Sequence, residues 1–238
     1  MIPFSPPRID QKMIDAVVDT LRSGWITTGP KTKLLEKQLG AYCGCPAFLC
    51  LNSATAGLEL MLRWFGVKEG DEVILPAYTY TATANVIIHC GATPVFVDVN
   101  KDDFNMDMAA VGRAITDRTK VVMPVDFAGL ACDYDALNTL VASKAELFRP
   151  DNDIQKSLGR ILVLSDAAHS IGAVYKGRKT GSLTDISVFS FHAVKNLTTA
   201  EGGGIALNLP APFRNDELYK QLCITSLHGQ NKDALAKT

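Results

Sequence analysis

A single lysine follows the end of an apolar, strand-like run, at a position that suits covalent chemistry. The run extends from Ile186 to Phe191, Lys195 comes four residues later, and three glycines occupy 202–204. An amine at the mouth of a buried strand is partly desolvated, which lowers its pKa towards neutrality. Such an amine can form a Schiff base with a carbonyl. Taken alone, the stretch is more typical of a surface lysine before a glycine-rich turn.

An aspartate and a histidine follow another apolar run. Asp166 comes directly after the run Arg160–Ser165, and His169 comes three residues later. An aspartate in this place can cap the next helix, or it can hold a protonated pyridine nitrogen through a charged hydrogen bond. In the helix expected over Ala167–Gly172, His169 lies on the same side as Asp166. A lone histidine there is more often a packing residue.

A third strand end carries groups that suit a phosphate. The run Ala47–Leu51 leads through Asn52 and Ser53 into an expected helix. A helix N-terminus offers free N–H groups, and Ser53 or Thr55 adds a hydroxyl, although Ser53 equally suits a helix cap without a ligand. Ligands of open parallel sheets lie at the carboxyl ends of the strands. A phosphate site, an aspartate and a lysine at three such ends together match pyridoxal 5′-phosphate (PLP), which has a phosphate, a pyridine nitrogen and an aldehyde.

The elements that position these residues are short apolar runs alternating with helical segments. Continuous apolar runs are typical of strands buried on both faces of a sheet, and the intervening helices favour a mainly parallel, seven-stranded α/β fold. The last two runs have no obvious helix between them, which leaves room for one antiparallel strand. The expected strands are Ala47–Leu51, Glu72–Leu75, Pro94–Val99, Lys120–Val125, Arg160–Ser165, Asp185–Phe191 and Gly204–Leu209. The expected helices between them are Ala54–Phe65, Thr81–Cys90, Met106–Ile115, Tyr134–Lys144 and Ala167–Gly172.

Two units are expected along the chain: an N-terminal arm and helix over residues 1–30, and a PLP-binding large domain over residues 31–238. Three prolines favour an extended arm over the first seven residues, and apolar residues at every fourth position predict a helix over Asp10–Arg22. The polar stretch Phe148–Leu158 predicts a mobile surface loop.

Composition excludes several classes of protein. With 24 basic and 25 acidic residues among 238, the chain has no basic face for nucleic acid. Its six cysteines form neither a disulfide framework nor zinc-type pairs, so no metal site and a reducing compartment are expected. No signal peptide and no membrane-spanning run are found, which predicts a cytoplasmic protein. P-loop, dinucleotide-binding and G-x-S-x-G patterns are also missing.

Six stretches of the chain together resemble one known family. They are Ser23–Lys31, Asn52–Gly57, Gly70–Ile74, Gly91–Asp98, Asp166–His169 and Phe189–Asn196. In this order they resemble the DegT/DnrJ/EryC1/StrS family of PLP-dependent sugar aminotransferases, and most closely its UDP-4-amino-4-deoxy-L-arabinose synthase branch. The resemblance implies the large domain of a fold-type-I PLP-dependent transferase.

The resemblance also implies roles for individual residues. Lys195 matches the lysine that forms the internal aldimine with PLP, Asp166 the partner of the pyridine nitrogen, and His169 the residue beside the ring hydroxyl. The remaining matches are Thr55, the backbone of Ala54, and Ser190 as phosphate ligands, Tyr80 as the ring that stacks on the cofactor, and Trp25 and His192 as weaker candidates near the sugar nucleotide.

The implied reaction transfers an amino group from L-glutamate to a nucleotide-linked keto-sugar, in a homodimer with shared active sites. Relatives continue beyond the position of Thr238 into a small C-terminal domain, so the chain is expected to be truncated. This leaves an alternative open, a catalytically incomplete PLP-binding domain without turnover.

Overall fold

The computed structural model describes residues 6–230. The expected arm therefore lies mostly outside the described residues, as does the expected ending at 231–238. The strands are β1 (Ala47–Leu51), β2 (Glu72–Pro76), β3 (Thr93–Val97), β4 (Thr119–Val122), β5 (Leu162–Asp166), β6 (Val174–Tyr175), β7 (Arg178–Lys179), β8 (Ile186–Ser190) and β9 (Gly203–Leu207). The α-helices are α1 (Gln11–Arg22), α2 (Pro30–Cys43), α3 (Ala54–Phe65), α4 (Thr81–His89), α5 (Met108–Ala114), α6 (Tyr134–Ser143), α7 (Asp153–Leu158) and α8 (Asn215–Thr225), and two 3-10 turns, η1 (Phe127–Gly129) and η2 (Ala145–Leu147), lie beside α6.

Seven strands form one sheet in the order β1-β9-β8-β5-β4-β2-β3. All seven predicted runs are strands of this sheet. β9 runs antiparallel to both of its neighbours, whereas the other pairs are parallel. The predicted mainly parallel α/β sheet is confirmed, and β9 is its antiparallel strand.

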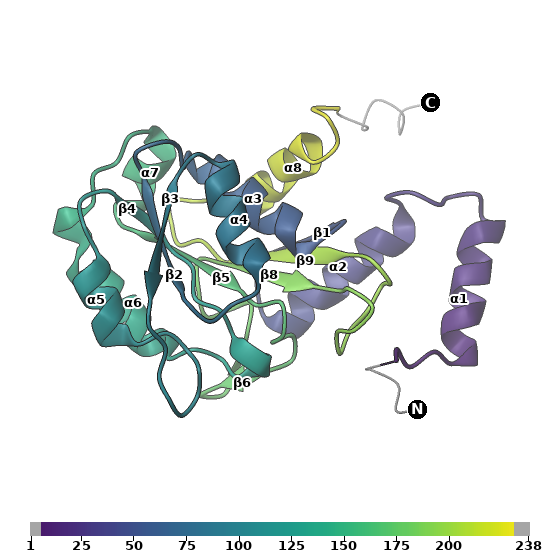
Figure 1. Cartoon of the computed structure of the whole chain (residues 1–238). Coiled ribbons are helices and arrows are strands. Elements are labelled where there is room, and N and C mark those ends of the chain that lie inside the picture. The colour runs from purple at the N-terminus through teal and green to yellow at the C-terminus, as the bar shows by residue number, and fades with distance from the viewer. Residues whose placement is uncertain (1–5, 231–238) are drawn as a thin grey trace.

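Helices cover both faces of the sheet, which explains why its strands are apolar along their whole length (Figure 1). Successive residues of a strand point to opposite faces. In β8, Val188 faces the large core beneath α3, whereas Phe189 faces a second cluster that includes Leu39 of α2. Burial on both sides fixes the register of the strands that end at the site.

Helix α1 stands apart from the body of the molecule (Figure 1). None of its residues is buried, and Lys31 Nζ at the start of α2 reaches back to Asp19 Oδ2 at 2.6 Å. The division into units 1–30 and 31–238 stays a prediction.

The prediction of a mobile surface loop over Phe148–Leu158 was wrong. Phe148 is buried, and residues 153–158 form α7. The side-chain amide of Gln155 is fully buried and donates to the backbone oxygen of Phe65 at 2.9 Å, at the end of α3. A segment whose polar side chains bond to backbone groups inside the fold has the same composition as a surface loop, which explains the error.

The helix predicted over Ala167–Gly172 was also wrong. The segment is a series of turns that leads into the β6–β7 hairpin, which was not predicted. The Ser170 hydroxyl donates to Asp126 Oδ2 at 2.6 Å, and Gly172 has a φ of 91°. A side chain bonded to the residue before η1 and a left-handed glycine both oppose a helix here.

Candidate active site

The predicted site residues lie at one edge of the sheet. Asp166 is the last residue of β5, Ser190 is the last residue of β8, and Ser53 follows β1 by two residues. These three strands point the same way, because β1 and β8 both run antiparallel to β9 and β5 is parallel to β8. Their carboxyl ends therefore meet at a common edge, the usual place for a ligand in such a sheet.

The Asp166 carboxyl group is almost fully buried, with 6% of the residue exposed. Its Oδ2 accepts a hydrogen bond from the Thr83 hydroxyl at 2.7 Å, and its Oδ1 accepts one from the backbone amide of Ala168 at 3.3 Å. Burial raises the pKa of Asp166, while these hydrogen bonds and the positive charges of His169 and Lys195 act in the opposite direction.

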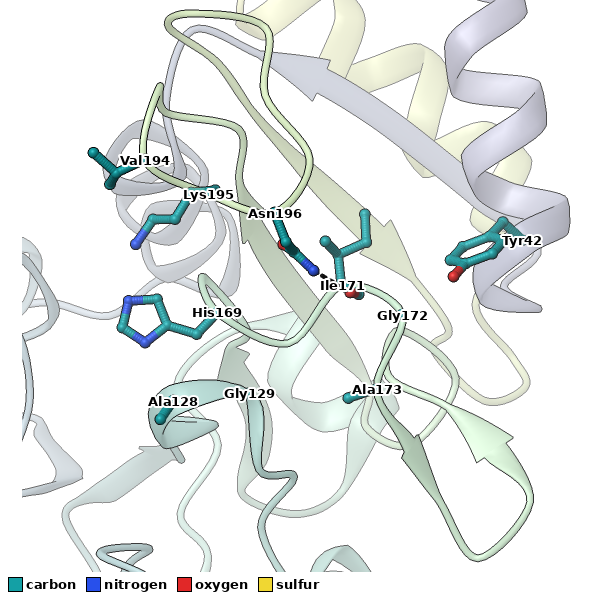
Figure 2. Close-up of a pocket in the computed structure, with 10 residues that line it drawn as sticks. All are labelled: Tyr42, Ala128, Gly129, His169, Ile171, Gly172, Ala173, Val194, Lys195 and Asn196. Atoms are coloured by element: carbon teal, nitrogen blue, oxygen red, sulfur yellow. Dashed lines mark hydrogen bonds between the residues drawn. The ribbon is translucent and has the colours of Figure 1, made fainter. Parts of the chain in front are cut away.

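Lys195 and His169 lie together in a cavity of about 660 Å³. Figure 2 shows the Lys195 side chain extending towards the imidazole ring of His169. Burial lowers the pKa of Lys195, and the negative charge of Asp166 partly opposes this effect. Within residues 6–230 no carboxylate forms an ion pair with Lys195. The pKa of His169 is lowered by desolvation and then by the Lys195 charge.

The loop that carries Lys195 is fastened to its surroundings by backbone contacts. The Lys195 amide donates to the His192 oxygen at 2.9 Å, and the Thr199 amide donates to the Phe191 oxygen at 2.9 Å. The side-chain amide of Asn196 donates to the Ile171 oxygen at 3.0 Å, which joins the loop to the turn after Asp166 (Figure 2). The lysine is thus held beside the histidine by its neighbours in sequence.

A close backbone contact brings the predicted phosphate donors together. Gly203 of β9 pairs with Ser190 on one side and Leu51 on the other. A Cβ atom at Gly203 would lie 2.4 Å from the Ala54 amide nitrogen, so the start of α3 rests directly on this glycine. In the part of the chain that the structure describes, the amides of Ala54 and Thr55 have no acceptor. These amides and the Ser190 hydroxyl form a set of donors that suits an anion.

Three further predicted residues do not line the cavity that holds Lys195 and His169. Tyr80 is 78% exposed at the N-cap of α4, and the Trp25 indole donates to the oxygen of its near neighbour Thr28 at 3.0 Å. His192 Nε2 lies 3.7 Å from Glu201 Oε1. Thr28 and Glu201 instead border a second cavity of about 970 Å³, together with Asn52 and Gly203.

Sequence reasoning missed two groups that contact the Asp166 region. Thr83 is fully buried against Asp166, and Thr79 lies behind it with its Oγ1 2.8 Å from Thr83 Oγ1. Asp126 is buried beside the same strand end, and its amide donates to the Asp166 oxygen at 3.2 Å. The sequence offered no signal for these threonine contacts, because Thr79 precedes the N-cap of α4 and the contact with Asp166 depends on α4 lying against the end of β5.

Residues 6–230 contain no helix that is both long enough and apolar enough to cross a membrane. Over the same range, no group of three or more His, Cys, Asp or Glu side chains is arranged to hold a metal ion.

Residues 7–238 match the DegT/DnrJ/EryC1/StrS aminotransferase family. The chain belongs to this family. Over 233 residues, or 98% of the chain, it is 45% identical to the UDP-4-amino-4-deoxy-L-arabinose–oxoglutarate aminotransferase of Shewanella sediminis and 41% identical to the spore coat polysaccharide biosynthesis protein SpsC of Bacillus subtilis. It spans 54% of each of these DegT/DnrJ/EryC1/StrS relatives, about half of their length.

Solved structures of family members share the fold. Spr1654 of Streptococcus pneumoniae, named as a sugar aminotransferase, is 54% identical in its PLP form, with a TM-score of 0.94 over 97% of this chain and 59% of that one. A PMP form of the same protein also has a TM-score of 0.94. The predicted family and fold-type-I architecture are therefore confirmed, and PLP is the cofactor of this family.

Proposed function

We propose that the chain binds PLP and forms the cofactor-binding domain of an aminotransferase that moves an amino group from L-glutamate to a nucleotide-linked keto-sugar. The observation that carries the proposal is the grouping of Lys195, His169 and Asp166 at one sheet edge, where no carboxylate of the described residues forms an ion pair with the amine. Family membership and the UDP-linked amino sugar in the name of the Shewanella relative support the substrate class.

The chemistry of the donors fits PLP. A buried carboxylate at Asp166 suits a protonated ring nitrogen, which it would hold through Oδ1. The amides of Ala54 and Thr55 and the Ser190 hydroxyl, which Gly203 brings together, would hold the phosphate. Tyr80 would stack on the ring, and Trp25 and His192 would contribute to the sugar-nucleotide side.

PLP, when bound, supplies an aldehyde that condenses with amines and a ring that accepts electrons. The lowered pKa of Lys195 increases the fraction of neutral amine at a given pH, so Nζ can attack a carbonyl and can take up or release a proton. The negative charge of Asp166 keeps a bound ring nitrogen protonated. His169, beside the amine in the cavity, would help to orient the ring.

Borohydride reduction of the purified chain with PLP, followed by peptide mass mapping, tests the covalent role of Lys195. We expect the mass of reduced PLP on the peptide that contains Lys195 and nowhere else. Lys195→Ala should lose the label, whereas the surface substitution Lys176→Ala should keep it. Labelling of Lys195→Ala at the same level would contradict the assignment.

A turnover assay with L-glutamate and a keto-sugar nucleotide separates the proposed enzyme from a PLP-binding domain without turnover. The chain spans about half of its relatives' length. A labelled Lys195 without any amino transfer would establish a PLP-binding domain without turnover. We also propose a homodimer, which sedimentation of the PLP-loaded chain would test.

A further inference from the structure

The Asp166 carboxylate is held by a residue from a distant part of the chain. Thr83 lies in the first turn of α4, and its hydroxyl is 2.7 Å from Asp166 Oδ2. The Thr83 side chain is fully buried. Behind it, Thr79 Oγ1 lies 2.8 Å from Thr83 Oγ1. The hydroxyls of Thr79 and Thr83 therefore form a relay of two hydrogen bonds that ends at Asp166 Oδ2.

The direction of this relay follows from the chemistry of its end. An ionised carboxylate only accepts hydrogen bonds, so Thr83 must donate its single hydroxyl proton to Asp166. The contact between the two threonines is then filled by the proton of Thr79. The order of donation is Thr79 to Thr83 to Asp166.

Because of the relay, the two carboxylate oxygens of Asp166 have different roles. Oδ2 is committed to Thr83, whereas Oδ1 has only the longer contact of 3.3 Å with the Ala168 amide. A hydrogen bond to a charged acceptor favours the ionised form and fixes the orientation of the group. Oδ1 is thereby left for a cationic partner.

We propose that Thr83, oriented by Thr79, is a positioning residue that keeps the Asp166 carboxylate ionised and leaves Oδ1 to pair with the ring nitrogen of PLP. The inference rests on the proposed function, because it assumes that PLP is the ligand at Asp166. It also joins Asp166 to Tyr80, since Tyr80 lies between Thr79 and the first residue of α4.

Several charged groups act on Asp166 besides the relay. Lys195 and His169 stabilise its negative charge, whereas Asp126, at the N-cap of η1, repels it. The hydrogen bond from Thr83 is the largest of the effects that oppose burial. Its removal should therefore raise the pKa of Asp166 even though Lys195 and His169 remain.

Carboxyl-carbon NMR titration of the chain without cofactor measures the pKa of Asp166 directly, with the resonance assigned from Asp166→Asn. We expect a higher pKa in Thr83→Val, which keeps the shape of the side chain without its hydroxyl, and a wild-type value in Thr83→Ser. PLP should bind about tenfold more weakly to Thr83→Val than to Thr83→Ser, because a hydrogen bond to a charged group is lost. Thr79→Val should shift both quantities in the same direction by less.

The outcomes distinguish this inference from the proposed function. An unchanged pKa and PLP affinity in Thr83→Val would overturn the relay while leaving PLP binding intact. If the wild-type chain does not bind PLP but the pKa of Asp166 is higher in Thr83→Val, the relay's effect on Asp166 would be supported and the proposed function would be overturned. Equal changes in Thr83→Val and Thr83→Ser would show that packing alone is responsible, and would also overturn the relay.

Discussion

The two edges of the sheet each carry a lysine removed from bulk water, and the two lysines have different surroundings. At the amino edge, Lys120 is 3% exposed, with Nζ 3.0 Å from Asp151 Oδ2 and 3.7 Å from Asp71 Oδ1. It also donates to the backbone oxygen of Arg149. At the carboxyl edge, Lys195 has no carboxylate within ion-pair distance among the described residues.

The difference teaches that partners, more than burial, decide what a lysine can do. The partners of Lys120 hold its charge in place, and its hydrogen bond lowers the pKa of Asp151. Asp166 is the carboxylate that acts on the pKa of Lys195, and it already accepts a hydrogen bond from Thr83. Lys120 is therefore a fixed structural charge, whereas Lys195 is an amine available for chemistry.

Lys195→Ala gives the largest expected effect on function and almost none on stability. Covalent PLP labelling should disappear, whereas the free energy of unfolding without cofactor should change by no more than about 0.5 kcal/mol, because no ion pair is lost. Urea unfolding of both chains measures the second quantity. A decrease of several kcal/mol in the free energy of unfolding of Lys195→Ala would contradict the difference proposed between the two lysines.

Lys120→Met should show the reverse pattern. Removal of one partner from a buried ion pair leaves a buried carboxylate uncompensated and costs about 3–4 kcal/mol. The exposed Lys156, paired with Asp153 at 3.0 Å, offers a matched control, since Lys156→Met should cost at most about 0.5 kcal/mol. Both variants, if folded, should still be labelled at Lys195. A stable Lys120→Met chain that cannot be labelled would contradict the structural role.

The buried acid beside Asp166 predicts a pH dependence specific to the carboxyl edge. Burial raises the pKa of Asp126 from 3.8 to about 6. The folded chain then keeps its proton where the unfolded chain has lost it, so this group makes the fold less stable as the pH rises from about 4 to 6. Asparagine cannot ionise, so the stability of Asp126→Asn relative to wild type should increase by about 1–3 kcal/mol over that interval.

Urea unfolding at several pH values checks this expectation, with Asp153→Asn as the exposed control. A difference between Asp126→Asn and wild type that stays constant with pH would show that Asp126 does not change its protonation there.

Gly203→Ala should lower the stability of the fold and have a selective effect on the anion site. The added methyl group would meet the backbone of Ser53 and Ala54 at about 2.5 Å, which costs about 1–2 kcal/mol of overpacking. PLP affinity should fall because the start of α3 is displaced from Ser190. The control is Gly112→Ala, whose methyl group would meet only Leu140 at 3.4 Å. Unchanged PLP affinity in Gly203→Ala would contradict a phosphate site at the start of α3.

Much of the fold was predictable because its signal is local. Continuous apolar runs fix the seven strands, and the missing helix before β9 anticipates the antiparallel strand. The errors occurred where polar side chains bond to distant backbone groups, as Gln155 does to Phe65. No periodicity records a contact across 90 residues of sequence.

The site was predictable only in part for the same reason. Lys195 and Asp166 each follow an apolar run and Ser190 lies near the end of one, so their edge of the sheet could be inferred. The role of Thr83 could not be inferred, because it depends on α4 lying against the end of β5. The sequence also does not indicate that Trp25 and Tyr80 lie outside the lining of the cavity.

The position of β9 sets the order in which the molecule can assemble. β8 and β9 are close in sequence and pair locally, so the loop with Lys195 can form as soon as both strands exist. β1 pairs with β9 across about 150 residues, and this pairing also seats α3 on Gly203. On the ribosome, β1 must wait for nearly the whole domain to emerge, so the anion site is completed late in synthesis and the lysine loop can form without it.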